Sequence, residues 1–148
     1  MVSWPWSRDP VGDPTLLAAD RGSGSLDDYD YDLVPRKAGV RIRLAAADPN
    51  AAEIATVVQL ARDEGVELET IVAARTIEQE RVDAPIEVRL FLGRRVSGVV
   101  GVVPRGLESV VDQTLRRLED RGDKARIPVE IVKTRRGLRV ELLMGATR

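Results

Sequence analysis

Residues 94–111 read RRVSGVVGVVPRGLESVV, and this stretch decides how the second half of the chain is expected to fold. Its run of valines predicts a buried strand, which must end at Pro104 because proline has no backbone N–H to donate to a sheet. Gly98 and Gly101 have no Cβ, so they predict a bend, a bulge or the close approach of another backbone segment. The turn at Gly106 leads directly into a helical pattern.

The sequence on either side of this stretch continues the alternation of apolar and polar residues. Residues 85–92 predict a strand that joins the valine strand through a hairpin turn at Gly93, and 107–122 predict an amphipathic helix. Residues 126–132 and 138–143 predict two more strands around the basic turn KTRRG. The side chains expected to face the core are Ile86, Val88, Leu90 and Leu92 of the first strand and Leu107, Val110, Val111, Leu115 and Leu118 of the helix.

A second helix is predicted over residues 48–65, DPNAAEIATVVQLARDEG. Asp48 or Asn50 can cap its first turn, and Glu53, three residues after Asn50, predicts a capping box. Gly65 predicts a left-handed exit from the helix.

The first helix is flanked by residues 39–44, which alternate as a half-buried strand, and by 66–77, which predict a strand although their second half would also tolerate a helix. The order is strand-helix-strand and then strand-strand-helix-strand-strand. We therefore expect residues 39–148 to form one α+β domain, in which a mainly antiparallel, barrel-like sheet is covered by two amphipathic helices.

Charge is distributed unevenly along the chain. The formal net charge of −1 divides into −3 for residues 1–37, −4 for 38–84 and +6 for 85–148. This asymmetry predicts either a polyanionic partner for the basic half, 85–148, or internal pairing between the two halves.

The chain contains no cysteine and no histidine. Thiol catalysis, disulfides and the usual zinc ligands are therefore excluded, and we expect no catalytic activity, no metal and no cofactor. The longest apolar run, 96–103, is much shorter than the ~20 residues of a membrane-spanning helix. We expect a cytoplasmic protein with no membrane contact, or a component of a virion or other assembly if its role is structural.

Residues 1–38 predict an extended tail that precedes the domain, since they are rich in proline, glycine and acidic residues. The tail carries the run DDYDYD and four of the five aromatic residues, and we predict that these four dock onto another protein or onto a second copy of the chain. The predicted docking residues are Trp4, Trp6, Tyr29 and Tyr31. Alternatively, the two tryptophans cover a patch of their own domain.

Over roughly residues 66–143 the chain resembles the HIRAN domain in the order of its elements. That order is a strand, the LGRR hairpin, GVVGVVPRG, a helix, a glycine and a pair of strands. The family's Gly-Tyr-Leu-Pro-Arg motif matches Gly101, Val102, Val103, Pro104 and Arg105. The resemblance implies a fold known for gripping single-stranded DNA at a free 3′ end. Two differences accompany it: only residues 83–85 echo the family's loop rich in Asn, Pro and Asp, and valine replaces the motif's tyrosine, so it cannot stack on a base.

The basic residues of the two hairpin tips predict contacts with a nucleic-acid backbone, because arginine and lysine bind phosphate oxygens. The candidate nucleic-acid-binding residues are Arg94, Arg95, Arg105, Lys133, Arg135 and Arg136. An ordinary charged surface is the alternative, in which acids and bases pair along the helix, as Asp112 would with Arg116. An acidic protein partner would also fit these residues.

Three functional hypotheses follow. The first is a non-catalytic nucleic-acid-binding module of HIRAN type. The second is a structural or adaptor subunit of a larger assembly, such as a phage particle, that docks through its N-terminal tail. In the third, the acidic run at 27–32 lies over the basic face and suppresses binding until it is displaced.

Overall fold

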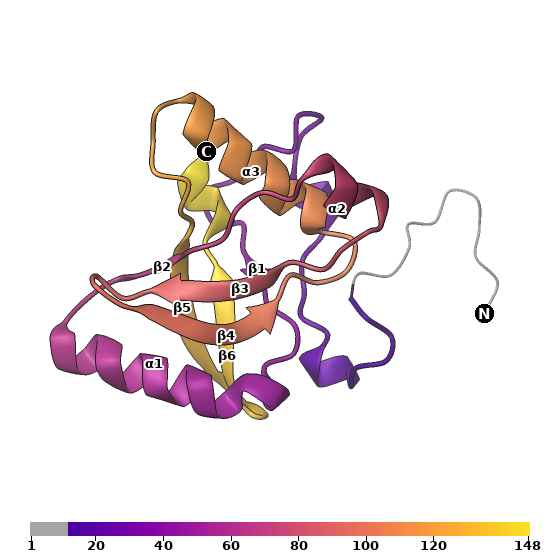
Figure 1. The fold of residues 1–148 in the computed structure, drawn as a ribbon. Coiled ribbons are helices and arrows are strands. Elements are labelled where there is room, and N and C mark those ends of the chain that lie inside the picture. Colours follow the sequence, from indigo (N-terminus) through magenta and orange to yellow (C-terminus); the bar gives the residue numbers. More distant parts are fainter. Residues whose placement is uncertain (1–11) are drawn as a thin grey trace.

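The computed structural model describes residues 12–148 and has the predicted α+β architecture (Figure 1). Six antiparallel strands form one sheet in the order β1-β6-β5-β2-β3-β4. The strands are β1 (Ile42–Arg43), β2 (Leu68–Thr70), β3 (Glu87–Phe91), β4 (Val96–Val102), β5 (Pro128–Thr134) and β6 (Gly137–Leu142).

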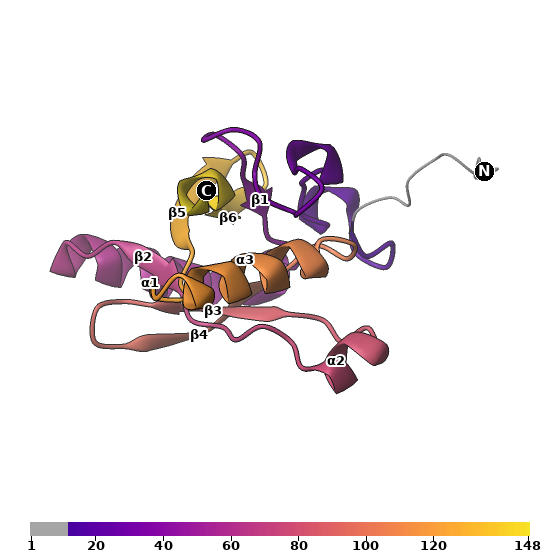
Figure 2. The same ribbon diagram turned by 90° about the horizontal axis from the view of Figure 1, so that it is seen from above.

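Two amphipathic helices cover the sheet, as predicted. α1 (Ala51–Glu64) lies along one end of the curled sheet, and α3 (Glu108–Asp120) crosses the other end (Figure 1, Figure 2). A third helix, α2 (Ile77–Arg81), is short. The remaining helical turns are of the 3-10 type: Ala18–Asp20, Leu26–Asp28, Asp48–Asn50 and Met144–Thr147.

The sheet curls until its two edges meet, which confirms the barrel-like prediction. Ala45, just beyond β1, pairs with Val102 at the end of β4. The Ala45 N–H donates to the Val102 carbonyl at 2.7 Å, and the Val102 N–H donates back at 3.0 Å. The first and last strands of the sheet are thus joined by one pair of hydrogen bonds.

The two glycines of the valine strand explain how β4 bends. β4 has one residue more than β3 on each side of the Arg89–Val99 pair, so two bulges follow each other. Gly98 lies within one of them, and Gly101, which pairs with Val88, borders the other. A Cβ on Gly101 would lie 2.9 Å from the Ala45 carbonyl oxygen, at the point where the sheet closes. Both the bulge and the close backbone approach that the sequence predicted at Gly98 and Gly101 are therefore present.

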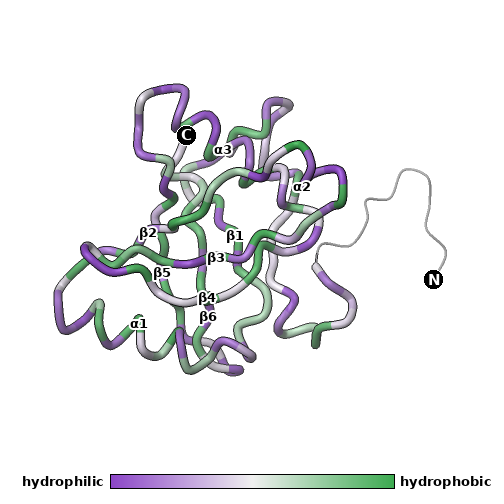
Figure 3. Tube along the Cα trace, viewed as in Figure 1, coloured by the Kyte–Doolittle hydropathy of each residue, from purple (hydrophilic) through white to green (hydrophobic). Residues whose placement is uncertain are grey.

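The core consists of the residues that the periodicities predicted. Every inward-facing position named for the strand at 85–92 and for the helix at 107–122 is buried, together with Ile42, Leu44, Ile54 and Leu142. The β3–β4 hairpin tip and the loop after α3 are hydrophilic, whereas the segment between β2 and α2 is hydrophobic (Figure 3). No helix within residues 12–148 is both long and apolar enough to cross a membrane.

The predicted capping box of α1 is wrong. The Asn50 side chain makes no cap and instead donates to the Ala46 carbonyl at 2.8 Å. Glu53 accepts from the Gly98 N–H of β4 at 3.0 Å. The 3-10 turn that leads into α1 is held from far away in the sequence, because the buried carboxylate of Asp20 accepts from the Ala47 N–H at 2.6 Å and from the next N–H group. The predicted left-handed exit at Gly65 is confirmed by its φ of 64°.

The strand predicted at 66–77 is shorter than expected, since β2 ends at Thr70. The chain then stays extended until α2 begins after Thr76 with a complete capping box. Here the Gln79 N–H donates to the threonine hydroxyl at 3.2 Å, and the Thr76 N–H donates to the glutamine side chain at 2.8 Å.

Residues 12–38, the N-terminal arm, pack along the domain. Ser23 pairs with Arg43 through two backbone hydrogen bonds of 3.1 and 2.9 Å. The Gly12 N–H donates to the Arg105 carbonyl at 2.8 Å. Together with the hydrogen bonds that the Asp20 carboxylate accepts from the turn before α1, these contacts make the arm part of the folded body from residue 12 onward.

Candidate nucleic-acid interface

The structure places the two basic hairpin tips at opposite ends of α1 (Figure 1). At the β3–β4 tip, Arg95 pairs with Glu64, the last residue of α1, at 3.4 Å. Near the β5–β6 tip, Arg139 pairs with Asp48 at 3.0 Å, in the 3-10 turn that precedes α1. An α-helix rises ~1.5 Å per residue, so the fourteen residues of α1 separate the two tips by about 20 Å. The two arginine pairs therefore do not form one cluster.

The β5–β6 tip presents unpaired cations. Lys133, Arg135 and Arg136 are exposed, and none of them makes an ion pair with an acid of residues 12–148. We call these three residues the basic hairpin. Its turn is held by Thr134, whose hydroxyl donates to the Gly137 carbonyl at 2.7 Å and accepts from the Arg136 N–H at 3.2 Å.

Arg105, the arginine of the HIRAN-like motif, is already engaged. Its guanidinium lies 2.6 Å from the Asp83 carboxylate and 2.8 Å from the Glu108 carboxylate. It also donates to the Asp83 carbonyl at 2.6 Å. This side chain fastens the start of α3 to the loop before β3, so a phosphate would have to displace two carboxylates to reach it.

The pair predicted between Asp112 and Arg116 is wrong. Asp112 is fully buried, and it accepts from the Arg75 Nε at 2.9 Å and from the Arg75 backbone N–H at 2.8 Å. Arg116 pairs instead with Glu80 of α2 at 3.1 Å. Asp112 lies three residues before Leu115, so both side chains are on the same face of the helix. This spacing was the sequence signal that Asp112 faces the core.

Four charged residues form a ladder across the outer face of β1, β6 and β5. Arg41 and Arg43 contact Glu141 at 3.1 and 2.8 Å, and Arg41 also contacts Glu130 at 2.9 Å. Burial alone would raise the pKa of Glu141, but the hydrogen bonds and charges of Arg43 and Arg41 outweigh it and hold this pKa below 4.5. The ladder neutralises part of the charge that the sequence shows on these strands.

The aromatic residues predicted to dock onto a partner lie in different environments. Trp4 and Trp6 fall outside the described residues. Tyr29 is only 3% exposed, and burial, followed by the charge of Asp28, raises the pKa of its hydroxyl. Tyr31 is 99% exposed. Of the two tyrosines, Tyr31 is therefore the one that is accessible to a partner.

The acidic run at 27–32 does not lie over the basic hairpin. Its Asp30 holds a local turn by accepting from the Asp32 and Val34 N–H groups at 2.9 and 3.0 Å. The charge of Asp30 acts on Arg117 of α3, whereas the basic hairpin is at the α1 end of the molecule (Figure 1). In this arrangement the acidic run leaves the basic hairpin uncovered.

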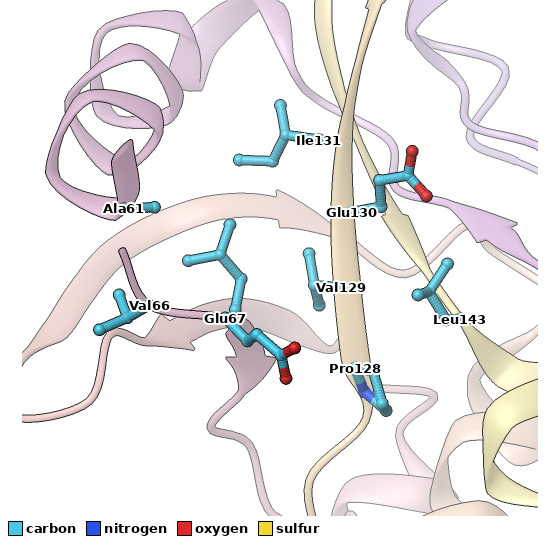
Figure 4. Close-up of a pocket in the computed structure, with 9 residues that line it drawn as sticks. Ala61, Val66, Glu67, Pro128, Val129, Glu130, Ile131 and Leu143 are labelled. Atoms are coloured by element: carbon cyan, nitrogen blue, oxygen red, sulfur yellow. The ribbon is translucent and has the colours of Figure 1, made fainter. Parts of the chain in front are cut away.

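A groove of about 510 Å³ opens beside β5 (Figure 4). Its walls come from the end of α1, from β2 and from β5, and they are mostly apolar. The lining residues are Ala61, Val66, Glu67, Leu68, Pro128, Val129, Glu130, Ile131 and Leu143. The sequence analysis missed this groove, because it depends on the pairing of β2 with β5 beginning only at Leu68.

Within residues 12–148, no group of three or more acidic side chains is placed to hold a metal ion. A scan against models of protein families, a search of curated proteins and a search of solved structures each found no match.

Proposed function

We propose that this protein is a non-catalytic module that contacts the backbone of a nucleic acid through the basic hairpin. The observation that carries the proposal is the set of three exposed cations, Lys133, Arg135 and Arg136, that have no acidic partner within residues 12–148. Because no ion pair has to be broken first, their full charge is available to phosphate groups.

The other candidate residues are less suited to this role. Arg105 is held by two carboxylates, and Arg95 contacts Glu64. Arg94 is exposed and unpaired among the described residues, but it stands alone at its tip. The basic hairpin is thus the one place among the predicted positions where several unpaired cations lie together.

The chemistry of the basic hairpin favours backbone contact over base recognition. The aromatic residues of the described chain, Tyr29, Tyr31 and Phe91, lie on other elements, and Arg126 stacks over the Phe91 ring at 4.0 Å. Without an aromatic platform, binding depends on counterion release and carries no sequence preference. Three phosphate contacts predict a slope of about −2.7 in a plot of log affinity against log salt for duplex DNA.

A fluorescence-polarisation titration of the full chain with labelled duplex and single-stranded DNA, at several salt concentrations, tests the proposal. We expect Arg135→Glu/Arg136→Glu to weaken binding by at least about tenfold and to reduce the salt slope by about 2. Arg81→Glu/Lys124→Glu is the matched control, since both side chains are exposed and the net charge changes equally.

Two results would contradict the proposal. One is the absence of salt-dependent binding by the parent protein. The other is an equal loss of binding in the control, which would show that overall charge, not the basic hairpin, is responsible.

A further inference from the structure

β5 has a neighbour along its whole length on one side only. β6 pairs with it from Val129 to Thr134, whereas β2 pairs with Val129 and Pro128 alone. The rest of β5, from Glu130 to Thr134, has no strand of residues 12–148 on the β2 side. This part of β5 is an open edge within the curled sheet.

The direction of the backbone groups follows from the register. The Leu143 N–H donates to the Pro128 carbonyl at 2.9 Å, so even-numbered residues of β5 bond toward β6. The Thr70 N–H donates to the Ile127 carbonyl at 2.9 Å, so odd-numbered residues bond toward β2. The N–H and C=O groups of Ile131 and Lys133 therefore point away from β6, to the side where β2 is missing.

The groove lies where β2 would pair with β5 if the strand began before Leu68. Its floor is built from Ala61, Val66, Leu68 and Ile131, which are only partly buried and continue the core to the surface (Figure 4). An open sheet edge beside apolar side chains is the arrangement in which proteins accept an extended peptide as an additional strand.

The rim of the groove is acidic at its β2 end. Glu67 is exposed and lines the groove, and Glu69, two residues along β2, points to the same face. Neither carboxylate makes an ion pair within residues 12–148. Lys133 of the basic hairpin follows two residues after Ile131, at the other end of the open edge of β5. A bound segment would be electrostatically complementary to this edge if it carried a cation at the end that lies next to β2 and no cation at the end that lies next to the basic hairpin.

We propose that this groove binds an extended segment of a partner protein, which adds as a strand to β5. The segment places an apolar side chain over Val66 and Ile131, and a lysine or arginine at the end that abuts β2 lies against Glu67. This interaction surface rests on the backbone edge of β5 and the apolar groove, and not on the hairpin cations that the proposed nucleic-acid contact uses, although the two surfaces meet at Lys133.

Hydrogen exchange of the full chain with a defined probe tests the proposal. The probe is a capped peptide that alternates valine and threonine and carries one terminal lysine; a second peptide carries glutamate instead. In the free protein the Glu130 and Val132 amides, bonded to β6, are protected, and the Ile131 and Lys133 amides exchange quickly. We expect the lysine peptide to bind saturably and to slow exchange at Ile131 and Lys133.

Charge reversal supplies the matched control. The glutamate peptide should bind about tenfold more weakly than the lysine peptide, because an attraction to Glu67 becomes a repulsion. Glu67→Lys, a change at an exposed position, should reverse this preference. N-methylation of the peptide's edge-facing amides should abolish binding.

The proposal is overturned if neither peptide binds saturably, if both bind equally, or if the methylated peptide binds as tightly as its parent. Binding without slower exchange at Ile131 and Lys133 would also overturn it, since the peptide would then lie elsewhere. Slower exchange that depends on protein concentration, with no peptide present, would assign the edge to a second copy of the chain and equally overturn the proposal of a partner segment.

Discussion

Arginines of the same chemistry have different roles in two regions of this molecule. Arg75 is buried, and it joins the segment after β2 to α3 by donating to Asp112 and to the Ala84 carbonyl at 3.0 Å. Arg135 and Arg136 are exposed at the basic hairpin and are unpaired within residues 12–148. The difference shows that location, not residue type, decides whether an arginine holds the fold together or is available to a ligand.

The buried pair should dominate the effect on stability. Asp112→Asn removes the buried counter-charge of Arg75 and leaves only the exposed Asp83 carboxylate, at 3.7 Å, so we expect the free energy of unfolding to fall by about 3–5 kcal/mol. Urea denaturation followed by circular dichroism measures this loss. A change below about 1 kcal/mol would mean that water reaches the Arg75 guanidinium and replaces the carboxylate.

The charge ladder should give a smaller, pH-dependent effect. Glu141 has its pKa held below 4.5 in the folded state, so its contribution to stability is present above pH 4.5 and is lost as the pH falls through the folded-state pKa. We expect Glu141→Gln to destabilise the protein by about 1–2 kcal/mol near neutral pH.

Denaturant titrations of parent and variant across this pH range test the ladder. The two stabilities should converge in acid, where the parent carboxylate is protonated. A difference that stays constant with pH would show that the ionised state of Glu141 is not what stabilises the strands.

The basic hairpin should give the smallest effect on stability. Arg135→Gln/Arg136→Gln removes two charges that make no ion pair within residues 12–148, so the free energy of unfolding should change by less than about 0.5 kcal/mol. Thermal melts of parent and variant measure this change. A clear gain in stability would indicate that these arginines repel one another or Lys133, while a clear loss would reveal a structural role for the tip.

Several elements could be predicted from the sequence because they depend on local periodicity. The apolar repeats identify α1, α3 and the strands, and Gly65 ends its helix as expected. The contact that holds the turn before α1 could not be predicted, because its acceptor, Asp20, lies far away in the sequence from the Ala47 N–H that it binds. The same holds for Asp112, whose partner Arg75 comes from another element.

The candidate sites were predictable in part. The basic hairpin was identified from the sequence because a turn between two strands must project its residues outward. The engagement of Arg105 by Asp83 and Glu108 could not be foreseen, since it requires the loop before β3 to meet the start of α3. The groove beside β5 arises because β2 pairs with β5 only from Leu68 onward, which no local pattern in 66–77 indicates.

The amino-acid sequence alone determined the order of elements, the apolar faces, the bends at Gly98 and Gly101 and the excess of positive charge in residues 85–148, since each depends on the identity and spacing of neighbouring residues. The tertiary structure decided which charges are neutralised, where the N-terminal arm packs and which strand edge stays open. These properties depend on distances between residues far apart in the chain, and such distances are established only when the sheet closes between Ala45 and Val102.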